Sequence, residues 1–313
     1  IIVDESSMID MWLARQFFQR VRPGTRVVLV GDVDQLQSVG AGDVFRELID
    51  SGLIPVTVLD EIFRQKKGSL IAYNAKRINE ANIDLQYGED FQFVKCQTQE
   101  EAADLICRIF CEQVAIHGIE RVQILSPFRS EGLASVEQLN TAIRELVNPV
   151  KDEIADLKVG SNYFRVGDKV MQTKNNDKAS NGDIGYIRKM GRNEKNEMMV
   201  TIAFSGGRIA EYGMEEMSHI ELAYATTVHK AMGSEFDIVI MPILRSHYIM
   251  LNRNIVYTAI TRAKEQVIPV GQKKMLITAI LKKTTGKRNT LLGERIGKYL
   301  KAFACRNELK NVS

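Results

Sequence analysis

Two clusters of acidic and amide side chains near the start of the chain could together bind a metal ion and orient a water molecule. Asp4 and Glu5 directly follow one short apolar run, and Asp32 and Gln35 lie just after another. Acidic and amide groups brought together at the carboxyl ends of neighbouring strands are how an α/β domain assembles a ligand site. A single pair of carboxylates after an apolar run is more often a solvated turn, so this chemistry requires that the two clusters meet.

The elements that must position these side chains are two strands joined by a helix. The runs 1–3 and 27–30 are rich in β-branched residues and predict buried parallel strands. Between them, apolar residues recur every four positions until Pro23-Gly24 ends the pattern, which predicts a helix. The face of this helix consists of Ile9, Leu13, Phe17 and Val21. Because parallel strands present their carboxyl ends at one edge, the sequence predicts a ligand site there.

Further α/β units follow, with an all-β segment among them. Residues 98–101 form a capping box before an amphipathic helix, and residues 122–125 form an apolar strand that ends at Ser126. From 161 to 214, apolar and polar residues alternate around Gly and Asn turns, which predicts a small antiparallel barrel inserted between helical units. On pattern alone, a plain structural module explains this segment equally well.

The composition is that of an ordinary globular protein with a basic end. The 313 residues suggest about two domains, with 45% hydrophobic and 26% charged residues. The net charge is +3, but residues 272–313 carry 11 basic and two acidic side chains, so the rest of the chain carries −6. The basic tail is either a solvated helix face or an extra nucleic-acid contact.

Sequence features of membrane insertion, export and metal binding are missing from the 313 residues. No apolar run approaches the length of about 18 residues that spans a bilayer. The first residues do not have the pattern of a signal peptide. The four cysteines show no paired C-x-x-C spacing. We therefore expect a cytoplasmic protein with no membrane partner.

Five motifs resemble those of superfamily 1B DNA helicases of the RecD-like family. Asp4-Glu5 resembles the Walker B motif. Residues 31–40 resemble motif III, with Gln37 in place of the usual Pro. Residues 61–65 resemble motif IV. Residues 226–237 resemble motif V, with Met232 where Gln is usual, and 257–264 resemble motif VI. The segment 161–214 is similar to the Src-homology-3-like insertion of the same family.

The resemblance implies ATP and Mg²⁺ as cofactors and assigns roles to several residues. Asp4 would hold the Mg²⁺ of ATP and Glu5 would activate the attacking water. Gln35 would sense the γ-phosphate, Arg64 would reach it, and Arg262 would be the arginine finger. The implied cofactor-binding set is Asp4, Asp32, Gln35, Arg64, Gly233, Glu235 and Arg262. The implied DNA-binding set is Ser126, Pro127, Asn140, Thr227, His229 and Lys230. Without the resemblance, His229 and Lys230 would be an ordinary imidazole and a solvated charge.

The predicted fold is an α/β tandem RecA-like P-loop NTPase core, with a partial first domain and a small SH3-like β-barrel insertion. Residues 1–60 would be the last part of the first RecA-like domain, and 61–160 the first part of the second. The barrel would occupy 161–214, the rest of the second RecA-like domain 215–275, and the basic C-terminal tail 276–313.

The predicted function is an ATP-dependent 5′-to-3′ DNA helicase motor that acts on single-stranded DNA and at the duplex junction. The 313 residues contain no G-x-x-x-x-G-K-[ST] phosphate-binding loop. We therefore expect the chain to be truncated before Walker B and to be inactive alone. The alternative is a non-catalytic nucleic-acid-binding or regulatory remnant. A free-standing helicase, a subunit of a recombination nuclease and the helicase half of a conjugative relaxase all stay open.

Overall fold

The computed structural model describes residues 1–59, 68–150, 156–282, 288 and 290–310, without the side chains of 303–310. The chain forms two compact units, residues 1–63 with 283–313 and residues 64–282. Each unit has a hydrophobic core of its own. Within the described ranges, no helix combines the length and the apolar character that crossing a bilayer requires.

The first unit is built on two short parallel strands. Strand β1 (Ile2–Val3) pairs with β2 (Val28–Leu29) in the register Ile2 to Val28. A single 3-10 turn, η1 (Ser6–Met8), follows β1. The helices of the unit are α1 (Met11–Phe18), α2 (Val44–Asp50) and α8 (Leu292–Lys310). Leu292 and Ile296 of α8 pack against a small core of Ala14, Val44 and Leu48.

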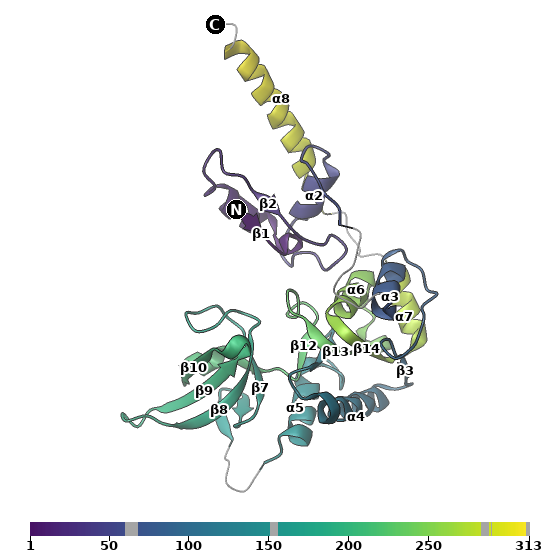
Figure 1. Cartoon of the computed structure of the whole chain (residues 1–313), viewed down its shortest axis with the longest axis vertical. Coiled ribbons are helices and arrows are strands. Elements are labelled where there is room, and N and C mark those ends of the chain that lie inside the picture. Colours follow the sequence, from purple (N-terminus) through teal and green to yellow (C-terminus); the bar gives the residue numbers. More distant parts are fainter. Residues whose placement is uncertain (60–67, 151–155, 283–287, 289, 311–313) are drawn as a thin grey trace. The chain divides into compact units, whose positions relative to one another are not determined.

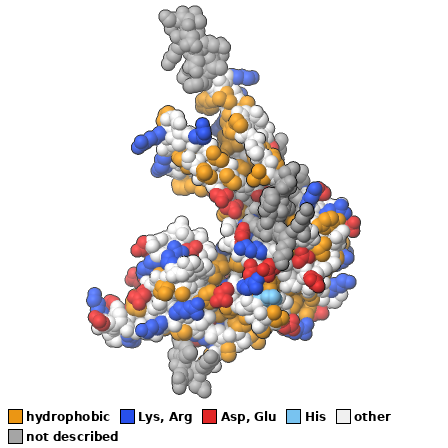
Figure 2. Space-filling model, viewed as in Figure 1, with side chains coloured by type: hydrophobic (Ala, Val, Ile, Leu, Met, Phe, Trp, Pro, Cys, Tyr) orange, Lys and Arg blue, Asp and Glu red, His pale blue; other side chains and the backbone are white. Residues whose placement is uncertain are grey.

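The predicted burial of the first two strands is wrong. The side chain of Ile2 is 76% exposed and that of Val28 is 46% exposed. The reason is that, in the part of the chain that the structure describes, helices cover one face of this two-stranded sheet, where Leu29 packs against the core of α1 and α2, while the paired Ile2 and Val28 lie on the other face. Hydrophobic side chains accordingly gather on the visible surface of this unit (Figure 2).

The second unit contains a five-stranded parallel sheet in the order β12-β4-β13-β14-β3 (Figure 1). The strands are β3 (Val94–Lys95), β4 (Val122–Ser126), β12 (Ala225–Thr227), β13 (Phe236–Ile243) and β14 (Ala263–Gly271). The two longest strands, β13 and β14, lie side by side near the centre of the sheet. All five residues of β4 are buried, including the polar Gln123 and Ser126, and the strand ends at Ser126 as predicted.

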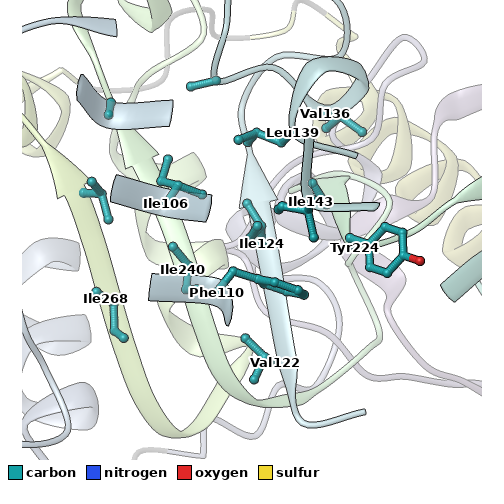
Figure 3. Close-up of a cluster of buried hydrophobic side chains, with 14 of the residues drawn as sticks. Ile106, Phe110, Val122, Ile124, Val136, Leu139, Ile143, Tyr224, Ile240 and Ile268 are labelled. Atoms are coloured by element: carbon teal, nitrogen blue, oxygen red, sulfur yellow. The ribbon is translucent and has the colours of Figure 1, made fainter. Parts of the chain in front are cut away.

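Helices cover both faces of this sheet. On one face, α4 (Gln99–His117) and α5 (Val136–Val147) pack over the strands. Their apolar stripes interlock with side chains of β4, β13 and β14, as Figure 3 shows for Ile106, Phe110 and Leu139. Thr98 caps α4 as predicted, because its hydroxyl accepts a hydrogen bond from the Glu101 N–H at 3.1 Å. The other face carries α3 (Leu70–Asn79), α6 (Arg253–Thr261) and α7 (Lys273–Leu281).

An antiparallel sheet is inserted between α5 and β12. Its strands run in the order β10-β9-β8-β7-β11 around a separate core that includes Phe164, Ile202 and Tyr212. The strands are β7 (Lys169–Gln172), β8 (Ile184–Arg192), β9 (Met198–Phe204), β10 (Ile209–Gly213) and β11 (Ile220–Leu222). A hairpin, β5 (Leu157–Val159) with β6 (Asn162–Phe164), precedes them. The antiparallel structure thus extends on both sides of 161–214, where the sequence predicts the insertion.

Buried polar groups join the inserted sheet to the parallel sheet and its helices. The Asp168 carboxylate is fully buried and accepts hydrogen bonds from Arg144 Nε of α5 at 3.0 Å and from the Tyr224 hydroxyl at 3.0 Å. Next to it, Lys169 Nζ donates to the carbonyl oxygens of Ile119 at 3.1 Å and Val122 at 2.9 Å. These contacts fix where β7 begins relative to β4.

Candidate functional site

The turn after β1 holds the two carboxylates that sequence analysis assigned to ATP hydrolysis. The Glu5 N–H donates to the Asp4 carboxylate at 2.8 Å, and the Ser6 N–H donates to the Val30 carbonyl at 2.8 Å. Glu5 has φ 50 and ψ 39, a left-handed conformation that costs a non-glycine residue about 1–3 kcal/mol. Asp4 is exposed and Glu5 is half-buried. The chain therefore turns sharply where the predicted catalytic carboxylate stands.

The loop after β2 meets this turn through a close backbone approach. A Cβ atom on Gly31 would lie 3.0 Å from the Ser7 nitrogen and 3.1 Å from the Ser6 nitrogen, so only glycine fits without displacement. Within the loop, the Gln35 amide donates to the Asp32 carboxylate at 3.0 Å, and Gln35 is 8% exposed. Asp32 thus orients the Gln35 amide, and the loops that follow β1 and β2 lie together as predicted.

Arg288, from the segment before α8, holds the far end of the same loop. Its guanidinium donates to the Ser38 carbonyl at 2.8 Å, the Ser38 hydroxyl at 3.1 Å and the Gly42 carbonyl at 2.6 Å. It also donates to the Gly40 carbonyl. Because the planar Arg288 guanidinium donates to several backbone carbonyls at once, it holds the loop 38–42 in one conformation.

In the second unit, the carboxyl ends of β4 and β12 lie next to each other. Thr227 pairs with Ser126 across the two strands, and the Lys230 N–H donates to the Thr227 hydroxyl at 3.2 Å. Burial lowers the pKa of His229, because the imidazolium would lose hydration. His229 is therefore mainly neutral at physiological pH, and Lys230, rather than His229, contributes a positive charge at this edge of the sheet.

Ser126 and Asn140 stabilise this edge of the sheet through hydrogen bonds to backbone groups. The Ser126 hydroxyl is buried and donates to the Ala134 carbonyl at 2.9 Å. The Asn140 amide donates to the Leu222 and Ala225 carbonyls at 3.1 and 3.0 Å and accepts from the Ala225 N–H at 2.8 Å. Pro127 is also buried. In this structure these three side chains position the loop and β12, and the DNA contacts expected of them stay predictions.

The residues of motifs V and VI that sequence analysis assigned to the nucleotide form one cluster in the second unit. Arg262 is 1% exposed, ends α6, and donates to the Ser234 carbonyl at 3.4 Å. Gly233 has φ 77, a conformation that favours glycine. The exposed Glu235 forms an ion pair with Lys264 at 3.1 Å. The predicted arginine finger is thus packed beneath the Gly233–Glu235 turn.

Three family models match three separate, successive stretches of the chain. An AAA domain matches residues 1–99, the SH3 domain of ATP-dependent RecD-like DNA helicases matches residues 139–204, and a UvrD-like helicase C-terminal domain matches residues 222–270. An ATP-dependent RecD2 DNA helicase of Deinococcus radiodurans is 32% identical over 311 residues, which is 95% of this chain. The chain belongs to the RecD-like helicases.

This RecD-like chain spans only part of the length of its relatives. It covers 39% of the Deinococcus radiodurans protein. A RecBCD enzyme subunit RecD of Mycolicibacterium smegmatis is 29% identical over 93% of the chain, which covers 54% of that protein.

Solved structures share the fold. A Pif1 helicase from Bacteroides in complex with ADP-AlF3 and ssDNA aligns with a TM-score of 0.58 and 17% identity over 97% of this chain and 75% of that one. A Pif1 helicase from Candida albicans aligns with a TM-score of 0.56 and 17% identity over 96% and 76%. At this identity the likeness concerns the fold alone. The predicted fold class, α/β with a RecA-like parallel sheet and an SH3-like insertion, is confirmed.

One predicted residue of this RecD-like chain cannot be compared with the structure, and two contacts could not be predicted from the sequence. The predicted phosphate-contacting Arg64 lies outside the residues that the structure describes. Arg288 looked like one more cation of a basic tail, and its contact with Ser38 spans 250 positions. Glu221, which pairs with Lys230 at 2.7 Å, carried no signal beyond a polar residue in a strand pattern.

Proposed function

We propose that these residues belong to an ATP-dependent DNA helicase that moves 5′-to-3′ along single-stranded DNA and opens the duplex ahead of it. The observation that carries the proposal is the arrangement after β1 and β2, where Asp4 and Glu5 lie on a turn packed against the loop in which Asp32 orients Gln35. The RecD-like family membership supports the same activity. The polarity rests on the family alone.

The carboxylates fit the Mg²⁺ of a nucleotide, because their oxygens are hard ligands and Asp4 is exposed. Asp4 would hold the ion, which when bound would neutralise charge on the phosphate oxygens. Glu5 would orient the attacking water and accept its proton. Gln35, fixed by Asp32, would contact the terminal phosphate, and Arg262 would stabilise the charge that develops on it. Gly233 and Glu235 would contact the nucleotide.

We further propose that the 313 residues alone do not hydrolyse ATP, since they contain no phosphate-binding loop with a G-x-x-x-x-G-K-[ST] pattern. Such a loop supplies the backbone N–H groups and the lysine that hold the phosphates. Single-stranded DNA would lie against Thr227, His229 and Lys230. The ATP-dependent movement along DNA would take place in the cytoplasm.

Glu5→Gln tests the catalytic assignment in the full-length protein. Glutamine keeps the size of the side chain but cannot accept a proton, so nucleotide binding should persist while hydrolysis falls by about 10²–10⁴. Fluorescent-nucleotide binding and phosphate release measure the two steps separately. Glu294→Gln, at an exposed position of α8, is the matched control.

Three outcomes would contradict parts of the proposal. Normal turnover by Glu5→Gln would remove the assigned role of Glu5. A full-length wild-type protein that binds DNA but shows no ATP turnover would instead support the non-catalytic alternative. Robust hydrolysis by the 313 residues alone would contradict the requirement for the missing loop.

A further inference from the structure

Two cations converge on one carboxylate at the edge of the sheet where β4 and β12 end. Lys230 Nζ lies 2.7 Å from Glu221 Oε2, and Arg129 Nη2 lies 2.8 Å from Glu221 Oε1. The three side chains come from separate elements: Arg129 follows β4, Glu221 belongs to β11 of the inserted sheet, and Lys230 follows β12. One carboxylate therefore uses both of its oxygens to bind cations from the parallel-sheet part of the unit.

The arrangement has the charge and spacing of an occupied phosphate site. Nitrogen-to-oxygen distances of 2.7–2.8 Å are those of charge-assisted hydrogen bonds to carboxylate or phosphate. The same residues line a small cleft together with Thr226 and Thr227. Thr227 is one of the residues that the family resemblance places against the DNA backbone. The cleft thus places two cations and the Thr227 side chain around a single anionic group.

Carboxylates already neutralise the two cations, so another anion has to take the place of one of them. Arg129 also contacts the Glu137 carboxylate at 3.4 Å, so two cations face two carboxylates. The side chains of Arg129 and Glu221 are 57% and 32% exposed, and that of Lys230 is 29% exposed. Solvent-accessible ion pairs of this kind exchange partners at little cost. A nucleic-acid phosphate can therefore bind both cations only if it displaces Glu221.

We propose that Arg129 and Lys230 form a binding site for one backbone phosphate of single-stranded nucleic acid, which Glu221 occupies when no strand is bound. The proposal rests on the proposed function, which supplies the strand, and adds Arg129 and Glu221 to the residues that govern its binding. Because Glu221 belongs to β11, strand binding releases a contact that the inserted sheet makes with the end of β12.

The test measures the affinity of a fluorescein-labelled oligothymidylate for the full-length protein by anisotropy, without nucleotide, at several salt concentrations. Glu221→Gln removes the competing charge while keeping the size of the side chain. It should lower the Kd by about three- to tenfold. Glu211→Gln, an exposed position on β10 of the same inserted sheet, should leave the Kd unchanged.

Arg129→Ala gives a second, independent readout. It should raise the Kd and reduce the slope of log affinity against log salt by about 0.7, the contribution of one cation to single-strand binding. In a background of Arg129→Ala with Lys230→Ala, Glu221→Gln should no longer improve the affinity, because the charges it competes for are gone.

The outcomes separate this inference from the proposed function. If the wild-type protein does not bind the oligonucleotide, the proposed function fails. If the wild type binds but Glu221→Gln, folded by circular dichroism, binds equally or more weakly, Glu221 is a structural ion pair and the inference is overturned. An unchanged salt slope in Arg129→Ala would also overturn it, whether or not Glu221→Gln folds.

Discussion

Lys169 should make the stability of the second unit depend on pH. Its side chain is 1% exposed, and its ammonium donates to the carbonyl oxygens of Ile119 and Val122 in the buried junction. Burial lowers the pKa of Lys169 to about 7, because the charged form loses its hydration. An unfolded lysine keeps a pKa near about 10.4. Between these two values, the unfolded chain binds a proton that the folded chain has released.

Stability should therefore rise with pH across this window, because unfolding takes up a proton there. The slope approaches about 1.4 kcal/mol per pH unit for one proton. Between about pH 7.5 and about pH 9.5 the free energy of unfolding should increase by about 2 kcal/mol. Below about pH 7 both states are protonated, and the full cost of the buried charge is present.

Lys169→Met isolates this effect, since methionine is apolar, unbranched and does not titrate. Urea unfolding followed by far-UV circular dichroism reports both units, whereas fluorescence of the single tryptophan, Trp12, follows the first unit alone, so comparing the two signals isolates the transition of the second unit. The difference in unfolding free energy between wild type and Lys169→Met should grow in favour of the wild type by about 2 kcal/mol over the window. Lys189→Met, at an exposed position of β8, should keep the wild-type profile. Parallel pH profiles for wild type and Lys169→Met would refute the reasoning.

Two further predictions concern ATP turnover by the full-length protein. Arg288→Ala frees the loop 38–42 and should lower turnover by about ten- to a hundredfold at unchanged single-strand affinity, and Arg288→Lys should not rescue it, because lysine lacks the planar fork. Wild-type turnover in Arg288→Ala would contradict this role. Arg262→Ala should lower DNA-stimulated turnover by about 10³–10⁵, with circular dichroism as the check on folding; a loss below tenfold would rule out an arginine finger.

Local patterns in the sequence predict the elements of the second unit well, for a physical reason. The largely apolar segment 122–125 predicts a strand that ends at Ser126, and β4 spans Val122–Ser126. Thr98 before the apolar stripe of 102–110 predicts the start of α4. In both cases the information lies within a few neighbouring residues, where the end of a strand and the cap of a helix are decided.

The same kind of pattern fails where distant segments decide the environment. The β-branched run 1–3 predicts burial, yet Ile2 is 76% exposed, because burial of a strand depends on layers that other segments supply. Lys169 follows a Gly-Asp turn and resembles a surface residue. Its acceptors at Ile119 and Val122 lie 50 and 47 positions away. The spacing of neighbouring residues contains no information about such a contact. The burial of the Lys169 ammonium therefore could not be predicted from the sequence.

Charge counts fail for a related reason, which bears on how this RecD-like chain binds nucleic acid. The +9 of residues 272–313 suggests either a solvated face or a cationic surface. Arg288 belongs to neither kind of surface, because its guanidinium N–H groups already donate hydrogen bonds to the carbonyls of Ser38 and Gly42. Lys230 is likewise paired, with a carboxylate that a phosphate could replace. A backbone carbonyl cannot leave its cation without unfolding the loop, whereas an exposed carboxylate can. A cation held by backbone carbonyls, as Arg288 is, is therefore not available to a strand, so the number of available cations is smaller than the sequence count.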